Sequence, residues 1–278
     1  MLGISNKNKY KKITIHTIVI IGSLFMIGPF IWMLLTSLKT LGETTQVPPV
    51  IFPKEIIWSN YSDVLKLLPF AKFFFNTFIT ALGRTVGQLL ISSMAAYAFA
   101  RIEFPGRKML FLMILSILMV PPQSFYIPQY IIMGKLGWLN SLKALIFPGL
   151  FSAFGTFLLR QFFMTLPKEL EESARLDGCN HFQIYWHIML PLAKPGLIAL
   201  AIFVVRWSWN DFMWPLIVNT STSKMTLSVG LASLQGQYLT NYPVLMAGAL
   251  IAIFPMLIIF ILLQKQFVEG IALTGTKG

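Results

Sequence analysis

The chain is poor in charge and nearly free of cysteine. Only 12% of its 278 residues are charged, whereas a soluble domain carries about 25%. Hydrophobic residues make up 56% of the chain. The single cysteine, Cys179, excludes an internal disulfide, and the absence of a CxxC pair argues against a cysteine-built metal site. This composition disfavours a soluble fold and predicts an integral membrane protein.

Motifs for nucleotide binding, hydrolysis and metal binding are also lacking. There is no GxxxxGK[ST] loop to cradle ATP phosphates, no HExxH pattern and no Ser/His/Asp arrangement. The three histidines form no metal constellation, and we expect His181 and His187 to lie at the surface. We therefore expect no enzyme active site, no metal and no cofactor in this chain.

Long apolar runs are what the sequence does contain. About 18 or more apolar residues suffice to cross a bilayer core of ~30 Å. Prolines within the runs predict bent helices, which a membrane bundle tolerates. Six stretches qualify as spans, at about 15–35, 73–99 (interrupted by Arg84), 109–131 (bent at Pro121 and Pro122), 144–159, 196–218 and 244–263.

The first run could instead be a signal peptide. It extends from Ile13 to Leu38 without a charged residue, which is too long for a typical signal core, and no small-x-small cleavage pattern follows it. We therefore expect an uncleaved first span.

The net charge of +12 could indicate nucleic-acid binding, but the basic residues flank the apolar runs instead of gathering in one patch. Thirteen Lys and Arg residues fall on the side of the termini and seven on the other side. The richer side is expected to be cytoplasmic. The predicted organisation is a cytoplasmic N-terminus at 1–14, a six-span domain at 15–267 with a cytoplasmic loop at 167–191, and a cytoplasmic tail at 268–278. The long outer loop, 39–70, is expected at the membrane interface.

The loop 166–191 has the pattern of two short helices separated by Gly178, which accepts a positive φ cheaply. Leu166, Leu170 and Ala174 recur at four-residue spacing, which places them on one face. Glu171, Glu172 and Arg175 are expected on other faces, toward solvent or a partner. After the glycine, aromatic residues from Phe182 to Trp186 form a second apolar face. The loop is either a docking element for a cytoplasmic protein or an amphipathic helix on the membrane surface.

The same loop resembles the EAA loop of bacterial ATP-binding-cassette importer permeases. That pattern is Glu-Ala-Ala, three residues, Gly, nine residues and Ile-x-Leu-Pro, and this chain matches it without a gap from Glu172 to Pro191. Ser173 replaces the first alanine, a change from one small residue to another. Other stretches are similar to the carbohydrate-uptake, maltose-type branch. They are TSLK, MAAYAFARIEFPGR, LRQFFMTLPKELEESARLDG, WNDFMWPLIV and QKQFVEGIALTGTKG.

The resemblance implies an all-α membrane protein with six transmembrane helices and a coupling helix between spans four and five. It implies a bacterial inner-membrane location and four kinds of partner: a second permease, two ATPase subunits that bind ATP and Mg, an extracytoplasmic solute-binding protein and a sugar. The tail from Thr274 to Gly278 is expected to reach the ATPases. The residues implied in ATPase coupling are Glu172, Ser173, Ala174, Asp177, Gly178, Ile188, Leu190 and Pro191.

Polar residues inside two spans are candidates for the substrate pathway. A stripe in the second span steps by four residues, and a polar stripe in a membrane should face a bundle interior or water. The candidates are Asn76, Thr80, Arg84, Gln88, Arg206, Trp209, Asn210 and Asp211. The alternative is structural: Arg206 could pair with Asp211, with a neighbouring permease or with free carbonyls, and Gly83 and Gly87 could serve helix packing. The resemblance implies a sugar as substrate, and a neutral and an anionic sugar both remain open.

Two other classes of function remain as alternatives. A proton- or sodium-coupled carrier is expected to carry intramembrane carboxylates, and Asp211 is the one carboxylate within a predicted span. A membrane-embedded enzyme would need a catalytic constellation, and the sequence shows none. Copurification with an ATPase would separate these alternatives from an ATP-driven importer.

Overall fold

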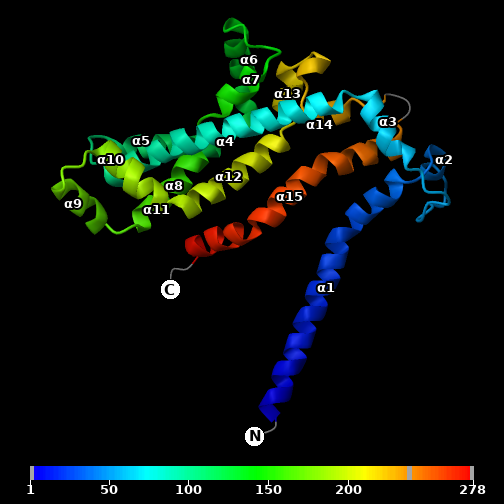
Figure 1. The fold of residues 1–278 in the computed structure, drawn as a ribbon, viewed down its shortest axis with the longest axis horizontal. Coiled ribbons are helices and arrows are strands. Elements are labelled where there is room, and N and C mark those ends of the chain that lie inside the picture. The colour runs from blue at the N-terminus through cyan, green and yellow to red at the C-terminus, as the bar shows by residue number, and fades with distance from the viewer. Residues whose placement is uncertain (1–2, 237–239, 276–278) are drawn as a thin grey trace. The chain divides into compact units, whose positions relative to one another are not determined.

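A computed structural model describes residues 3–236 and 240–275, with side chains for 11–236 and 240–262. The described chain is helical throughout and contains no strand (Figure 1). The α-helices are α1 Gly3–Ser37, α2 Leu41–Thr44, α3 Ser59–Leu67, α4 Phe70–Arg101, α5 Arg107–Ser116, α6 Tyr126–Lys135, α7 Leu142–Ile146, α8 Ala153–Thr165, α9 Glu169–Leu176, α10 His181–Ile184, α11 Leu190–Leu192, α12 Lys194–Trp209, α13 Met213–Val218, α14 Leu227–Ala232 and α15 Tyr242–Gly275. Short 3₁₀ turns connect some of them, and a π-helical segment, Tyr185–Met189, joins α10 to α11.

The chain divides into two compact units. The first comprises Met1–Leu68 and Ser233–Phe254, and the second comprises Pro69–Ala232 and Pro255–Gly278. All candidate site residues named above lie in the second unit.

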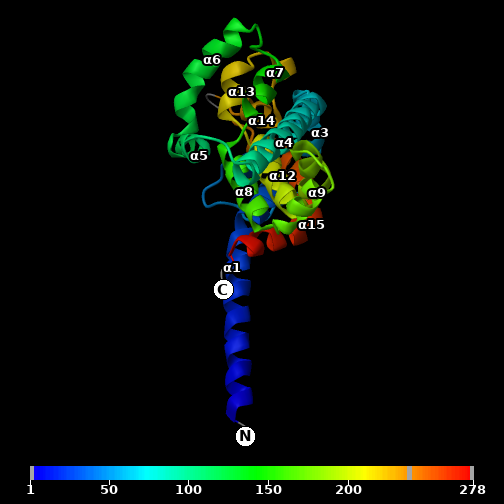
Figure 2. The same ribbon diagram turned by 90° about the vertical axis from the view of Figure 1, so that its left-hand side faces the viewer.

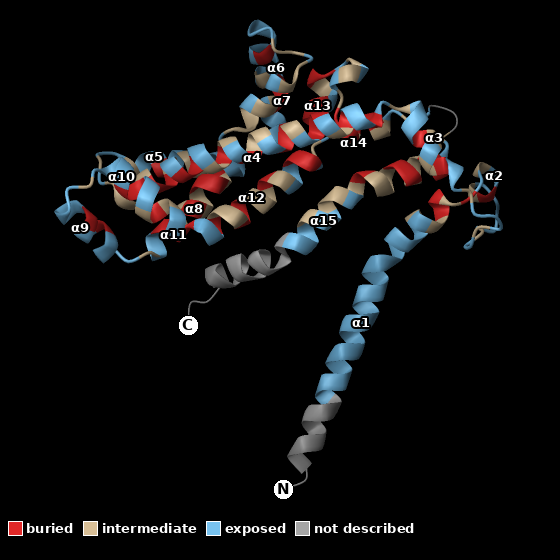
Figure 3. Ribbon diagram, viewed as in Figure 1, coloured by how far each residue is buried: buried red, intermediate tan, exposed pale blue. Residues whose placement is uncertain are grey.

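Three helices, α4, α8 and α12, form the centre of the second unit and lie side by side (Figures 1 and 2). Their facing sides are buried, while their outer sides are exposed (Figure 3). Small residues permit this close approach, as expected for helices packed in a membrane. A Cβ at Gly155 of α8 would lie 3.0 Å from Ser92 Oγ of α4, and one at Gly196 of α12 would lie 2.7 Å from the Phe162 ring of α8. A Cβ at Gly83 or Gly87 of α4 would lie 3.1 Å from Ile146 Cδ1 or 2.2 Å from Leu150 Cδ2, so the packing role expected for these two glycines is confirmed.

Two of the predicted spans are interrupted rather than continuous. The fourth breaks at Phe151 and Ser152, where the Ser152 side chain accepts a hydrogen bond from the Gly155 amide and caps α8. The fifth breaks at 210–212, so that 196–218 becomes α12 and α13. Such breaks in membrane helices are tolerated where the backbone is buried in protein. The bend expected at Pro121 and Pro122 is present, with an angle of 101° between the two parts.

Two described helical stretches are long and apolar enough to cross a membrane alone, Lys11–Ser37 and Tyr242–Leu262. Four further spans result if each of four bent helix pairs crosses as one unit, which gives six. The fold is therefore all-α with up to six membrane-spanning elements, as the sequence predicts. The last of the four pairs joins the segment His181–Leu192 to α12 at an angle of 76°. If this pair crosses as one unit, the fifth span begins further toward the N-terminus than predicted.

The first unit contains the loop that follows α1. Lys39 is buried, its Nζ donates to the Val50 carbonyl oxygen and it lies 4.4 Å from the Trp32 ring centroid. Asn60 of α3 donates to the carbonyl oxygens of Ser37 and Lys39. These contacts hold the loop against the end of α1. Phe52 and Trp58 remain 71% and 68% exposed, which suits the interfacial position expected for this loop.

The predicted terminal segments are partly helical. Helix α1 begins at Gly3, within the segment 1–14, and α15 continues through Gly275, within the segment 268–278. The predicted contact of the tail with ATPases involves side chains that lie outside the described residues.

Candidate functional site: an exposed helix clamped to the bundle

Helix α9 (Glu169–Leu176) has well-defined ends. Glu169, Glu171 and Glu172 stand in its first turn, where acidic side chains favour the positive end of the helix dipole. Gly178 has a φ of +84°, and the Cys179 amide donates to the Ala174 carbonyl oxygen. This is the Schellman arrangement that ends a helix at a glycine. The terminator predicted at Gly178 is confirmed.

One face of α9 is exposed and the opposite face is buried. Glu172, Ser173, Asp177 and Gly178 are exposed, and Leu176 is 90% exposed. Ala174 is buried, as expected from its spacing. An exposed helix face with a large exposed leucine is available to a protein partner.

The sequence-based assignment of the α9 faces is wrong at two positions. Glu171, expected toward solvent or a partner, is buried, while Leu170, expected on the inner face, is 41% exposed. Glu171 and Ala174 are three positions apart and so share a face. The carboxylate tolerates burial because an arginine lies beside it.

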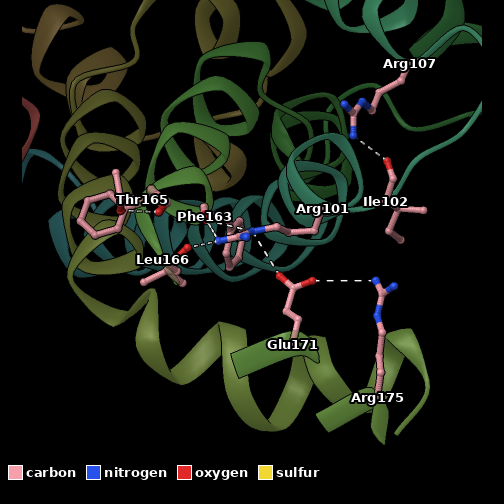
Figure 4. A network of polar contacts seen from close by, with 9 residues as sticks. Arg101, Ile102, Arg107, Phe163, Thr165, Leu166, Glu171 and Arg175 are labelled. Atoms are coloured by element: carbon pink, nitrogen blue, oxygen red, sulfur yellow. Dashed lines mark hydrogen bonds and ion pairs between the residues drawn. The ribbon is translucent and has the colours of Figure 1, made fainter. Parts of the chain in front are cut away.

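That arginine is Arg101, the last residue of α4. Its Nε lies 3.2 Å from Glu171 Oε1, and the two side chains are only 5% and 7% exposed. Its guanidinium also donates to the carbonyl oxygens of Phe163 and Leu166, near the end of α8. Arg175 lies on the other side of the carboxylate, 4.0 Å away (Figure 4). We call the contacts of Arg101 with Glu171, Phe163 and Leu166 the Arg101–Glu171 joint.

The joint sets the electrostatics of this end of the bundle. Burial raises the pKa of Glu171 above its ordinary value because it disfavours the charged form, and Arg101, Arg175, His181 and Lys168 oppose this rise. A polar cavity of about 440 Å³ lies beside the joint, lined by both basic and acidic side chains. They include Arg101, Glu103, Arg107, Lys168, Glu172 and His181.

After Gly178, the chain re-enters the bundle. Asn180 caps α10 in a reciprocal pair with Gln183. Ile184, Tyr185 and Met189 are buried, Ile188 and Leu190 are half-buried, and Pro191 is exposed. The Ser93 and Tyr185 hydroxyls lie 2.7 Å apart, which ties this segment to α4. The candidate coupling residues Glu172, Ser173, Asp177 and Gly178 are therefore exposed on α9 or directly after it. Ala174 is buried, and Ile188 and Leu190 contribute to the core behind the helix.

The aromatic face predicted after Gly178 is split between core and surface. Tyr185 and Met189 are buried, whereas Phe182 and Trp186 are 62% and 46% exposed and stack on each other at 6.2 Å. His181 and His187 are exposed, as expected. Among the described residues no cluster of three metal-ligating side chains occurs.

The polar stripe of α4 is buried in the second unit, and its larger members bond to backbone. Asn76 donates to the carbonyl oxygens of Ser223 and Met225, and Gln88 donates to that of Gly149. Thr80 and Ser92 are also buried. The expectation that the stripe faces a bundle interior is confirmed, and its hydrogen bonds favour the structural interpretation for Asn76 and Gln88.

Arg84 of the same stripe pairs with Asp211. The Nη1–Oδ2 distance is 2.8 Å, and the Arg84 Nε donates to the Leu145 carbonyl oxygen. The suggested pairing of Asp211 with Arg206 is therefore wrong. Asp211 lies in the break between α12 and α13, where the chain turns toward α4 instead of continuing along the face that carries Arg206.

The remaining candidates lie on α12. Arg206 and Asn210 are exposed, whereas Trp209 is buried and its ring packs edge-on against Phe74 at 5.5 Å. The Asn210 side chain donates to the Arg206 carbonyl oxygen. Within the described part of the chain, the Arg206 guanidinium has no ion pair. The structure therefore separates the two arginines into a neutralised one and an exposed one.

Arg101 was missed as a site residue because its position at the end of a span also fits a topological role. The burial of its partner, Glu171, could have been predicted from the helical period. Ala174 was expected to be buried, and Glu171 lies on the same face three residues earlier. Nothing local in the sequence indicates that the Phe163 and Leu166 carbonyl groups converge on the same guanidinium.

An all-helical membrane chain with an exposed, glycine-terminated helix held against its bundle has the features of a transporter membrane subunit. Residues 88–272 match the family model described as "Binding-protein-dependent transport system inner membrane component". The chain belongs to this family and is a permease subunit of an ATP-binding-cassette importer.

Named relatives agree with this assignment, and a solved structure shares the fold. The chain is 38% identical to the arabinooligosaccharides transport system permease protein AraQ of Bacillus subtilis (strain 168), over 92% of each chain. It is 33% identical to the sn-glycerol-3-phosphate transport system permease protein UgpE of Yersinia enterocolitica, over 92% of this chain and 94% of the relative. Its fold matches a chain of a bacterial ABC transporter involved in the import of the acidic polysaccharide alginate. The TM-score is 0.82 at 24% identity, covering 94% and 98% of the two chains.

Proposed function

We propose that α9 is the coupling helix through which this permease receives work from separate ATPase subunits. The single observation that carries the proposal is the division of α9 into an exposed face, with Glu172, Ser173 and Asp177, and a buried face fixed to the bundle. A partner protein can bind the exposed face of such a helix, and motion of the helix is then transmitted to the helices packed against its buried face. ATP and Mg bind to the partner subunits in this proposal.

The remaining partners and the orientation belong to the same proposal. A second permease completes the pathway, and an extracytoplasmic solute-binding protein delivers the substrate. Both termini and α9 face the cytoplasm, as the distribution of Lys and Arg favours. ATP-driven closure of the ATPases then switches the bundle between two packed states, which requires ATP to bind those states with different affinity.

The test is copurification and transport with altered α9. The variant Glu172→Arg, combined with Gly178→Val, should release the ATPase subunits from the purified transporter and abolish ATP-driven uptake into proteoliposomes. The matched control is Glu55→Arg, since Glu55 is exposed in the loop before α3 and lies outside α9 and its cavity. Unchanged ATPase copurification and uptake in the α9 variant would contradict the proposal.

The proposed substrate is a sugar or a sugar-like polyol. The names of the relatives include a neutral oligosaccharide in one case and a phosphorylated polyol in the other. With Arg84 neutralised by Asp211, Arg206 is the candidate for contact with an anion. An arginine without an ion pair at membrane depth is costly unless it faces water or a partner subunit, so we assign Arg206 and Asn210 to the pathway-facing side of α12.

Uptake of arabinotriose and of sn-glycerol-3-phosphate by Arg206→Gln separates the two substrate classes. A loss confined to the phosphate indicates an anion contact. Equal losses for both probes would remove the anion hypothesis and leave Arg206 with a structural role.

A further inference from the structure

The structure connects α9 directly to α4, a helix that the sequence of the loop gives no reason to associate with α9. Chain connectivity links α9 to α8 before it and to α10–α12 after it, so spans four and five are expected to follow α9. Helix α4 is remote in sequence from α9. The joint nevertheless fixes the end of α4 to α9 through one side chain, Arg101.

The geometry of the guanidinium makes this joint rigid. Arg101 donates through Nε and Nη2 to two backbone oxygens of one segment, at Phe163 and Leu166. The Glu171 carboxylate contacts the guanidinium as an ion pair, since Glu171 Oε1 lies 3.2 Å from Nε and accepts no hydrogen bond from the described residues. Arginine presents its donors in a planar fork, so it can hold several acceptors at once in fixed directions. Three elements, α4, α8 and α9, are therefore held by a single planar group (Figure 4).

The energetics favour an intact joint. Both charged side chains are more than nine-tenths buried. Separating them would leave a buried charge without its partner, which is strongly destabilising. The pair is thus more easily moved as a unit than opened.

We propose that Arg101 is a positioning residue that makes α9 and α4 one rigid body, so that work received by α9 enters the bundle through α4. This inference rests on the proposed function of α9 as the coupling helix. The contacts behind α9 support it: Ala174, Tyr97 and Tyr185 belong to one buried cluster that joins α9, α4 and the segment after Gly178.

The decisive experiment measures whether α9 and α4 move together in the assembled transporter. Spin labels are placed at Leu170 on α9 and at Met94 on the exposed side of α4, which are 41% and 51% exposed. The native cysteine is replaced by Cys179→Ser. The distance between the labels is recorded with nucleotide-free ATPases and after trapping with ATP, Mg and vanadate.

The distance should stay constant within about 2 Å on trapping, because helices within one packed unit shift by only ~1–2 Å. Glu171→Gln removes the charge but keeps the side-chain size. In this variant the distribution of label distances should broaden, or its mean should shift on trapping by about one helical turn, ~5 Å. Uptake per ATP hydrolysed should fall about fivefold or more. Glu171→Asp, which keeps the charge, should recover part of this loss.

Arg160→Gln is the matched control. Arg160 also joins α8 to α4, since its Nε donates to the Phe99 carbonyl oxygen, and it has no contact with α9 among its described partners. This variant should keep the label distance and the transport ratio even if it lowers the amount of protein. An equal effect in Arg160→Gln would assign the loss to general loosening and overturn the inference.

Two further outcomes separate this inference from the function on which it rests. A change of the wild-type label distance on trapping, with ATPases still bound, overturns the rigid joint alone. In a second outcome, Glu172→Arg loses ATPase copurification while Glu171→Gln keeps the wild-type uptake per ATP hydrolysed. This result supports α9 as the docking helix and overturns the role proposed for Arg101. Failure of the ATPases to copurify with the wild-type chain contradicts the coupling function itself.

Discussion

The two ion pairs of α4 have similar chemistry but differ in burial and surroundings. The side chains are 12% and 19% exposed in the Arg84–Asp211 pair and 5% and 7% exposed in the Arg101–Glu171 pair. Arg84 pairs with Asp211 at 2.8 Å, and Arg101 pairs with Glu171 at 3.2 Å. The two arginines lie roughly 25 Å apart along the helix. Each also donates to backbone carbonyl groups. Asp211 belongs to a break within the bundle, whereas Glu171 belongs to a helix whose opposite face is open.

This difference indicates different tasks. A pair enclosed within a bundle stabilises one arrangement of helices, and its loss is expected to appear as a loss of folded protein. A pair that holds a protruding helix also fixes how that helix transmits motion, and its loss is expected to appear as a loss of coupling in addition to a loss of stability. The following predictions are ordered by the size of the expected effect.

The largest effect is expected from Asp211→Asn. It leaves the Arg84 guanidinium without a compensating charge in the membrane, and removing one member of a buried pair costs about 3–5 kcal/mol. The amount of folded protein and the unfolding temperature in detergent should fall sharply. The double variant Arg84→Met with Asp211→Leu should recover much of the loss, because it removes both charges. A double variant as unstable as Asp211→Asn would show that the pair is not the cause.

The next largest effect is expected from Gly178→Val, which alters the end of the exposed helix α9. The φ of +84° at this position is strained for a β-branched residue. The last turn of α9 should become disordered at a cost of about 1–2 kcal/mol, and ATPase copurification should weaken while the bundle remains folded. Gly178→Asn is the control because asparagine tolerates this conformation. Equal copurification of both variants with the wild type would contradict the need for this helix end.

A smaller effect is expected from Gly87→Ala, one turn from Arg84. The added Cβ would lie 2.2 Å from Leu150 Cδ2, the end of a flexible side chain that can shift. Overpacking of this kind costs about 1–3 kcal/mol. The thermal stability of the purified protein should drop, and Leu150→Ala in the same chain should restore it. Unchanged stability would mean that Leu150 moves freely and that α4 is loosely packed beside the Arg84–Asp211 pair.

The smallest effect concerns pH, and it contrasts Glu171 with a carboxylate of the first unit. Glu43 accepts hydrogen bonds from the Lys54 and Thr40 amides, which lower its pKa below the ordinary value. Its stabilising contribution is therefore present above the pKa of the unfolded state and is lost as pH falls through the lowered pKa. Glu43→Gln should reduce thermal stability slightly at pH 7 and not below pH ~3. A difference that persists at low pH would exclude the ionised carboxylate as the cause.

The opposite sign is expected for Glu171. The pKa of Glu171 is raised in the folded state. At a pH between the ordinary and the raised pKa, the folded state therefore retains a proton that the unfolded state has lost. The contribution of Glu171 to stability is therefore largest below the ordinary pKa and decreases as pH rises through the raised one. Comparing the pH dependence of Glu171→Gln and Glu43→Gln under the same conditions tests both signs at once.

Much of this protein was determined by the sequence alone. The apolar runs, the bend at Pro121 and Pro122 and the helix end at Gly178 follow from local properties, since span length, proline and a glycine with positive φ act within a few residues. The twenty-residue spacing from Glu172 to Pro191 likewise indicated the family, because a short loop of fixed length carries its pattern in one continuous stretch.

The tertiary structure alone decided which charges meet. Asp211 pairs with Arg84 and not with Arg206, which is nearer in sequence, and Glu171 turns inward to Arg101. The breaks at 151–152 and 210–212 redirect the chain, and helical periodicity does not encode such changes of direction. A periodic pattern identifies which residues share a face. Only the packing of remote segments determines which face is buried and which buried charge finds a partner.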